Sequence, residues 1–349
     1  MGIFIGDNNS KAREIKNAYI GIDGKARKIK QIYVGDENGK ARLIWGNSLP
    51  MMIATEYQVY MSTNGGNTFE PITTNMASNA LCSYFTYDYD NKRYITTYVG
   101  LGYYSYDGYT WTRGCNGVSG FDSPLPIHYD EGVYTVAISR AGAYYSTDFV
   151  NWNRTGLSSQ YSGGIDTRDV VYDPISKNIA ELYYDKGYKW VVSTLTGQTL
   201  KTFSTEFYDI SNMIVANGYF IFAIAHTLYF ISTTNPNSYY TCKISDSYIS
   251  KICYHNGELI CATSGDIYKS TDLGKSFTTI SNLSGGYVVD LCYGNGYYWI
   301  VKNNKTYSSD GYSLYKSSNG SSWSLVQTFN NGSMRSCCLC IPERNGGRY

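Results

Sequence analysis

A short sequence phrase recurs about every forty residues, and this repeat constrains the fold more than any other feature of the chain. Each clear copy begins with serine, has an Asp or Asn two residues later, and closes on an aromatic side chain. Clear copies start at Ser62, Ser105, Ser146, Ser270 and Ser317, and weaker copies start at Ser193 and Ser232. The starting serines are 43, 41, 47, 39, 38 and 47 residues apart. Such a period in a strand-rich chain predicts the blades of a β-propeller.

From Met51 onward each unit follows one order of elements. An apolar strand leads through a tight turn to a second strand, and a short loop, the repeated phrase and a last strand follow. The tight turns include Asn217-Gly218, Asn256-Gly257 and Asn295-Gly296, and Asn-Gly between strand-like runs is the strongest short signal for a β-hairpin. Four strands per unit predict one antiparallel blade per repeat.

The two ends of this region supply complementary parts of one blade. Residues 51–54 read as a second strand that lacks its first, whereas the chain stops at residues 344–349 after a first strand and its turn. Joining these parts closes the ring without an open sheet edge. We therefore predict an all-β fold, with a seven-bladed β-propeller at residues 51–349 in which both termini complete one blade.

A separate unit with a shorter repeat occupies residues 1–48. Similar stretches begin at Ala12 and Ala26 and end in Asp23-Gly24 and Asn38-Gly39, and a third begins at Ala41. Apolar alternation before Asp-Gly or Asn-Gly predicts small β-hairpins, which are too short to bury a core alone. We interpret residues 1–48 as a basic attachment segment that orders by docking, with contact residues Tyr19, Tyr33 and Trp45.

Charge and composition exclude several classes of function. The net charge is +1, although residues 1–48 carry nine Lys or Arg against five Asp or Glu. Because those carboxylates interrupt the basic residues, we expect a solvated face and no nucleic acid partner. We see no signal peptide and no apolar run long enough for a membrane span, so we expect no membrane insertion. The nine cysteines lack zinc-ligand spacing, so we assign no metal, and without a phosphate loop or dinucleotide fingerprint we assign no cofactor.

The repeated phrase resembles the Asp-box, or bacterial neuraminidase repeat, of sialidases, sortilin-type domains and xyloglucan hydrolases. The copies at Ser62 and Ser270 match its S-x-[DN]-x-G-x-[TS]-[WF] pattern in full, and the other clear copies are one residue shorter. In that family the acidic side chain accepts backbone N–H bonds across the turn, and the aromatic packs between blades. The resemblance implies the same structural role for Asn64, Asp107, Asp148, Asp272 and Asn319.

A sialidase of this fold would need three arginines that grip the substrate carboxylate, a Tyr–Glu nucleophile pair and an aspartic acid. The F-R-I-P motif of that family is absent, since Ile341-Pro342 lies at the opposite end of the chain and lacks the arginine. We therefore expect no enzyme and assign no catalytic residue. A glycosidase with two carboxylates stays open, and its candidate groups are Glu56, Asp122, Asp166, Glu206, Asp209 and Asp266.

Propellers bind ligands mostly at the face opposite the box turns, where loops join strands two and three and neighbouring blades. Aromatic residues among polar ones suit sugars there, because rings stack on C–H faces and polar groups fix hydroxyls. We expect His226 to be the one histidine near a site, with His128 and His255 as ordinary surface or strand residues. The predicted ligand-binding residues are Arg140, Lys186, Tyr188, His226, Asp266, Phe121, Tyr161, Tyr208 and Tyr248.

The hairpins of residues 1–48, with phrases such as Ala26-Arg-Lys-Ile-Lys-Gln-Ile-Tyr-Val-Gly35, resemble repeats at the N-termini of tail, fibre and other virion proteins of phages and prophages. An attachment segment before a receptor-type propeller implies a non-enzymatic virion protein, which would be synthesised in the cytoplasm of the host bacterium without a signal peptide. It would dock on a virion structural protein through residues 1–48 and recognise a bacterial surface glycan or protein. The alternatives are a structural decoration or assembly protein of the particle and a glycan-degrading enzyme, and homo-oligomerisation in the particle stays open.

Overall fold

The computed structural model is built from β-strands, and its described residues contain no helix. The structure describes residues 49–55, 58–76, 84–98, 101–114, 126–138, 141–155, 166–184, 188–205, 211–263, 266–283, 287–304, 311–329 and 337–342. Within residues 1–48 it describes the backbone of six short strands.

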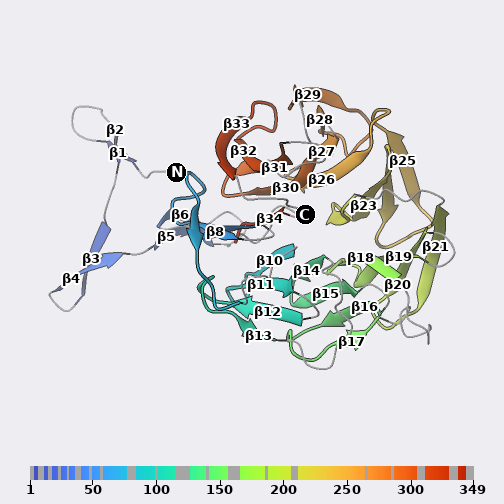
Figure 1. Ribbon diagram of the computed structural model, residues 1–349, viewed down its shortest axis with the longest axis horizontal. Coiled ribbons are helices and arrows are strands. Elements are labelled where there is room, and N and C mark those ends of the chain that lie inside the picture. Colours follow the sequence, from blue (N-terminus) through green and yellow to red (C-terminus); the bar gives the residue numbers. More distant parts are fainter. Residues whose placement is uncertain are drawn as a thin grey trace.

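Seven four-stranded antiparallel sheets form the ring of blades in Figure 1, so the predicted seven-bladed β-propeller is confirmed. In blades 2 to 7 the strands follow chain order from the centre of the ring outward. Blade 2 contains β10 (Tyr84–Asp88), β11 (Arg93–Tyr98), β12 (Leu101–Ser105) and β13 (Thr112–Arg113). Blade 3 contains β14 (Ile127–Asp130), β15 (Val133–Ile138), β16 (Gly142–Ser146) and β17 (Asn153–Arg154). Blade 4 contains β18 (Asp166–Tyr172), β19 (Asn178–Tyr184), β20 (Tyr188–Thr194) and β21 (Thr199–Thr205).

The remaining three complete blades repeat this arrangement around the other half of the ring. Blade 5 contains β22 (Ile214–Ala216), β23 (Tyr219–Ile224), β24 (Thr227–Ser232) and β25 (Tyr239–Lys243). Blade 6 contains β26 (Ile249–His255), β27 (Glu258–Thr263), β28 (Asp266–Ser270) and β29 (Thr278–Asn282). Blade 7 contains β30 (Val288–Gly294), β31 (Tyr297–Asn303), β32 (Tyr312–Ser317) and β33 (Ser324–Phe329).

Blade 1 is built from both ends of the propeller region, as the sequence predicts. Its strand order is β34 (Cys337–Cys340), β7 (Met51–Thr55), β8 (Val59–Ser62) and β9 (Glu70–Ile72). The inner strand β34 pairs antiparallel with β7, with Leu339 opposite Ile53 and Cys340 opposite Met52. The ring is thus closed by hydrogen bonds between segments nearly 300 residues apart in the sequence. Residues 344–349 lie outside the described residues.

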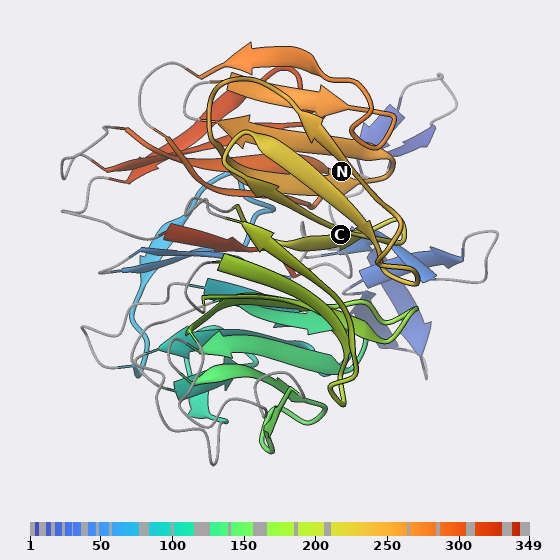
Figure 2. The same ribbon diagram turned by 90° about the vertical axis from the view of Figure 1, so that its right-hand side faces the viewer.

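Strand direction divides the ring into two faces, and the strands run from one face to the other in the side view of Figure 2. The turns between first and second strands share one face with the box turns, because Tyr94 at the start of β11 pairs with Ser105, where a box begins. We name this the turn face and the opposite one the loop face. Met51 likewise pairs with Ser62. Residues 1–48 therefore join the propeller at the turn face.

The hydrophobic core lies in the seams between neighbouring blades. Seven clusters of buried apolar side chains fill the seams, one cluster to each. Between blades 4 and 5, Trp190 stacks on Phe222 with ring centroids 3.5 Å apart. In the closing seam, Trp299 of blade 7 packs with Met51 and Leu339, which come from opposite ends of the chain. Burial of this apolar surface is the main force that holds the blades in a ring.

The strands of residues 1–48 form three isolated two-stranded hairpins, which lie outside the ring in Figure 1. They are β1 (Phe4–Gly6) with β2 (Ala12–Glu14), β3 (Ala18–Ile22) with β4 (Lys25–Ile29), and β5 (Gln31–Gly35) with β6 (Ala41–Gly46). The side chains of Tyr19, Tyr33 and Trp45 lie outside the described part of the chain, so their attachment role stays a prediction.

Candidate functional site

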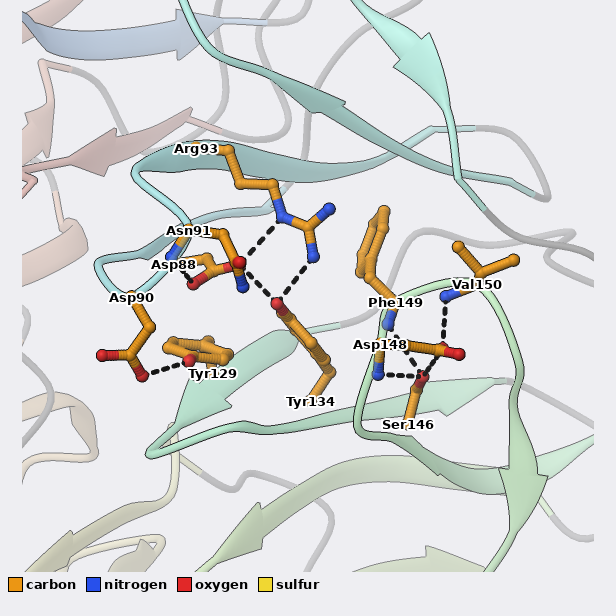
Figure 3. A network of polar contacts seen from close by, with 10 residues as sticks. All are labelled: Asp88, Asp90, Asn91, Arg93, Tyr129, Tyr134, Ser146, Asp148, Phe149 and Val150. Carbon is orange, nitrogen blue, oxygen red and sulfur yellow. Dashed lines mark hydrogen bonds and ion pairs between the residues drawn. The ribbon is translucent and has the colours of Figure 1, made fainter.

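The acidic and amide side chains of the boxes are used inside their own turns. In blade 3, Asp148 Oδ1 accepts the backbone N–H groups of Val150 at 2.8 Å and Asn151 at 2.7 Å, together with the Ser146 hydroxyl at 3.0 Å (Figure 3). Although burial opposes the shift, these donors lower the pKa of Asp148 to about 2. The side chains of Asn64, Asp107, Asp272 and Asn319 accept turn N–H groups in the same way. The weak copy expected at Ser193 differs, because its turn N–H bonds to Thr194 instead.

A buried arginine lies behind the box of blade 3 (Figure 3). Arg93 Nε lies 2.8 Å from Asp88 Oδ2, and a terminal nitrogen of Arg93 donates to the Tyr134 hydroxyl at 2.8 Å. The guanidinium also lies 5.0 to 5.6 Å from the ring centres of Tyr104, Phe149 and Tyr134, within the range of cation–π attraction. The charge of Arg93 is thus paired and enclosed by aromatic rings. Because Arg93 and Asp88 belong to blade 2 and Tyr134 to blade 3, the network joins these two blades.

A pocket of about 300 Å³ opens at the centre of the loop face, where the inner strands begin. It is lined by Tyr84, Pro126, His128, Arg168, Asp169, Leu182, Tyr188, Ser211, Asn212, Ser250, Lys251 and Asp290. Two tyrosine rings therefore stand among hydroxyl, amide, cationic and carboxylate groups. This combination can stack on one surface of a small polar ligand and fix its hydroxyl groups by hydrogen bonds.

Several polar groups of this wall tie one blade to the next. Asp169 Oδ2 accepts the backbone N–H of Met213 at 3.0 Å, which joins blade 4 to blade 5. Asn212 exchanges two hydrogen bonds with the backbone of Ile252 in blade 6, at 2.9 and 3.0 Å. Asp290 Oδ2 accepts the N–H of Leu339 at 2.9 Å and so closes the ring between blades 7 and 1. The two carboxylates of the pocket wall are thus structural acceptors.

In two other blades, proline and lysine occupy the position equivalent to Asn212 and Asp290. They cannot accept a backbone N–H from the next blade, a bond that we call the tether. Counting back five residues from the left-handed turn residues Glu131, Asn217, Asn256 and Asn295 leads to Pro126, Asn212, Lys251 and Asp290. A proline side chain has no acceptor, and a lysine ammonium only donates. In the blades that follow Pro126 and Lys251, the corresponding N–H group is bound within its own strand. Asp169 Oδ1 accepts the N–H of Val170 at 2.9 Å, and Asp290 Oδ1 accepts the N–H of Leu291 at 3.0 Å.

Few of the predicted ligand-binding residues meet in this pocket. Tyr188 lines it, whereas Asp266 and the exposed Tyr248 do not. Of the histidines, His128 lines the pocket from strand β14, whereas His226 does not line it, and the expectation that His226 lies near a site stays a prediction. His128 Nε2 lies 2.8 Å from Asp169 Oδ1, across the seam between blades 3 and 4. The predicted residues outside the described part of the chain are Arg140, Lys186, Phe121, Tyr161 and Tyr208.

A second pocket, of about 380 Å³, lies at the turn face. Its wall includes Tyr89, Asp130, Glu131, the exposed Ile175 and His255. Burial, together with the nearby carboxylates of Asp130, Asp90 and Glu131, raises the pKa of Tyr89 to about 12. The potential around Tyr89 is therefore negative. His255 stacks on Tyr293 with ring centroids 3.3 Å apart, and burial lowers its pKa.

Metal ligation and membrane spanning find no support in the part of the chain that the structure describes. There, no group of three or more His, Cys, Asp or Glu side chains is placed to hold a metal ion. Among the same residues, no helix has the length and apolarity to cross a bilayer. Cys253, Cys261, Cys292 and Cys340 are buried, whereas Cys242 is half-buried.

Comparisons with known proteins place the chain by fold alone. No family model matches the sequence, and no curated protein matches it. Among solved structures it is similar to YCF48 from Cyanidioschyzon merolae, with 15% identity, a TM-score of 0.56 and coverage of 74% of this chain and 94% of that one. It is also similar to the WD40 β-propeller domain of Doa1, with 10% identity, a TM-score of 0.56 and coverage of 74% and 87%. At these identities the structural similarity shows the propeller fold and does not indicate a ligand.

Proposed function

We propose that this protein is a non-enzymatic recognition module of a bacteriophage virion, whose loop-face pocket binds a saccharide of the bacterial surface. The observation that carries the proposal is the polarity of the ring. The pocket with Tyr84, Tyr188 and Asn212 opens on the loop face, whereas residues 1–48 join at the turn face. A module anchored at one face and open to a ligand at the other suits adsorption to a host. The virion assignment itself rests on the resemblance of the hairpin repeats.

The side chains of the pocket wall also favour binding of a saccharide over its hydrolysis. A glycosidase needs two carboxyl groups that act on the sugar, but Asp169 and Asp290 accept backbone N–H groups of the neighbouring blades. Glycan hydrolysis is kept as the alternative, since Glu206 and Asp209 lie outside the described residues. It would show itself as release of reducing sugar that disappears in Glu206→Ala or Asp266→Ala.

The test is binding of the full chain to an array of bacterial surface polysaccharides and to isolated envelope fractions. We expect Tyr188→Ala to weaken binding about thirtyfold, because loss of a stacked ring removes roughly 1 kcal/mol and loss of its polar contact a similar amount. Tyr254→Ala, in the turn-face pocket, is the matched control and should bind as the unchanged chain does. Absence of binding to every envelope fraction, or equal loss in both variants, would overturn the proposal.

A second candidate function, decoration or assembly of the particle, is favoured by the turn-face pocket. This pocket lies on the face from which residues 1–48 leave and has a negative wall. Removal of the propeller separates the two functions. Particles that adsorb normally but lose stability would support assembly, and particles that no longer adsorb would support recognition.

A further inference from the structure

One carboxyl group is buried between blades 3 and 4 with no described partner for its charge. Glu181 lies in the middle of β19 with an exposed fraction of 0%, and neither of its carboxyl oxygens accepts a hydrogen bond from a described residue. The Thr155 hydroxyl is the described group that favours the ionised form of Glu181, but its hydrogen is donated to the carbonyl oxygen of Ala143 at 3.3 Å. An ionised carboxylate without partners is strongly disfavoured in such surroundings.

The side chain of Glu181 faces blade 3. Along β19, Ala180 and Leu182 belong to the cluster against blade 5, whereas Ile179 belongs to the cluster against blade 3. Because successive side chains of a strand point to opposite faces, Glu181 lies on the same face of β19 as Ile179. On this side its cross-strand neighbours are Val170 and Val191.

Other polar groups of this side of blade 4 are also buried without a partner among the described residues. They are the hydroxyls of Thr167 and Ser193, both with an exposed fraction of 0%. By register, Thr167 pairs with Tyr183 and Ser193 with Ile179, one step to either side of Glu181. The carboxyl group therefore lies in a weakly satisfied polar patch inside an apolar seam.

Among the residues that the structure describes, no ionised neighbour compensates the charge of this carboxyl group. Titratable side chains on the elements packed around it include Tyr183 on β19, Lys189 on β20, Arg168, Asp169 and Tyr172 on β18, His128 on β14, Tyr134 on β15 and Tyr145 on β16. None of them contributes to its titration. Burial raises the pKa of Glu181 to about 7, and the Thr155 hydroxyl opposes that shift.

The seam between blades 3 and 4 also lacks the tether that joins other blades at the loop face. Pro126 occupies the place of the acceptor. Instead, His128 contacts Asp169 at 2.8 Å, and the Thr135 hydroxyl donates to the carbonyl of Val170 at 3.0 Å. His128, Arg168 and Asp169 are at the same time part of the pocket wall. Movement at this seam would therefore displace one side of the pocket.

We propose that the seam between blades 3 and 4 is a proton-controlled joint, which opens more readily as Glu181 loses its proton and thereby moves the pocket wall at His128 and Arg168. While Glu181 is protonated, the seam holds a neutral acid. When the proton leaves, opening the seam to water becomes the way to solvate the charge. The joint does not depend on the identity of the ligand or on the proposed function.

The sign of the pH dependence follows from the two states of Glu181. The open seam exposes a carboxyl group with the ordinary pKa near 4.5, whereas the closed seam raises that pKa to about 7. The closed state thus binds the proton more strongly, and its stability is fully present below about pH 4.5 and falls as the pH rises to about 7. Between pH 5.5 and 8 the opening constant should rise about 25-fold.

Hydrogen exchange of the full chain at pH 5.5 and 8, corrected for the chemical exchange rate, tests this joint. We expect peptides from β15 and β19 to lose protection about 25-fold relative to peptides from the tethered seam between blades 5 and 6. The isosteric variant Glu181→Gln should abolish this difference, whereas Glu70→Gln on the exposed edge strand β9 should retain it.

Two results would overturn the proposal. One is equal protection changes in the two seams of the unchanged chain. The other is persistence of the difference in Glu181→Gln, which would assign the pH dependence to another group such as His128. If Glu181→Gln does not fold, Glu181→Leu removes the same titration and takes its place in the experiment.

Discussion

At the scale of single residues, a box carboxylate acts as a hydrogen-bond acceptor within one turn. Asp148 illustrates this, because one of its oxygens holds two backbone N–H groups and a serine hydroxyl. Asn64 and Asn319 fill the same position in other blades with an amide oxygen. The position needs an acceptor and does not need a charge.

Substitution of Asp148 tests this interpretation. Asp148→Ala should lower the free energy of unfolding by about 1–2 kcal/mol, because it leaves turn N–H groups without an acceptor. Asp148→Asn should cost less at pH 7. Because the folded-state pKa of Asp148 is lowered to about 2, its charge stabilises the fold above the ordinary pKa. That advantage over Asn should disappear as the pH falls from about 4 to 2. Urea unfolding at several pH values measures these differences, and equal effects of Ala and Asn would contradict the prediction.

At the scale of elements, the box turns insert into the preceding seam through a residue with a left-handed backbone. Four clear boxes have glycine there, and a Cβ on Gly274 would lie 2.3 Å from Cζ of the buried Phe230. The box of blade 3 has Phe149 with φ 68° at the same place. Its ring fills the seam because Gly114 leaves room opposite, where a Cβ would lie 2.4 Å from the Phe149 ring.

Alanine at two glycines separates the backbone effect from the packing effect. Gly274 has φ +78° and Gly257 has φ +86°, but no atom lies within 4 Å of a Cβ on Gly257. Gly257→Ala should cost about 1 kcal/mol from the backbone alone. Gly274→Ala should cost about 1–3 kcal/mol more, because Phe230 must move. Thermal or urea unfolding compares the two, and similar losses would show that the seam adapts without strain.

At the scale of the whole molecule, closure of the ring depends on one short strand. Without β34, the edge of β7 would be open and Asp290 would lose the N–H of Leu339. Residues 1–48, in contrast, pair only within their own hairpins among the described strands.

Two deletions test this division of the chain. Removal of residues 337–349 should abolish cooperative unfolding and yield aggregated protein, because an apolar seam and a sheet edge become exposed. Removal of residues 1–48 should leave the Tm within about 2 °C of that of the full chain, since the seam clusters of the described residues contain no member of this segment. Calorimetry and size-exclusion chromatography report both results. A large fall in Tm without residues 1–48 would mean that the hairpins stabilise the propeller.

The amino-acid sequence by itself determined the number of blades, their strand order and the closure by both ends. These follow from local signals, since each box turn and each Asn-Gly turn is encoded within a few residues and repeated along the chain. It also pointed to Asn64, Asp107, Asp148, Asp272 and Asn319 as turn residues.

Only the tertiary structure decided which residues form the site and the seams. The loop position of Tyr188 is readable in the sequence, but His128, Asp169 and Asn212 form hydrogen bonds with partners in another blade. Glu181 reads in the sequence as one acid in a strand, and its burial depends on blade 3 packing against it. The physical reason is that turns are local, whereas burial, cross-blade hydrogen bonds and the raised pKa of Glu181 arise between segments that the sequence keeps apart.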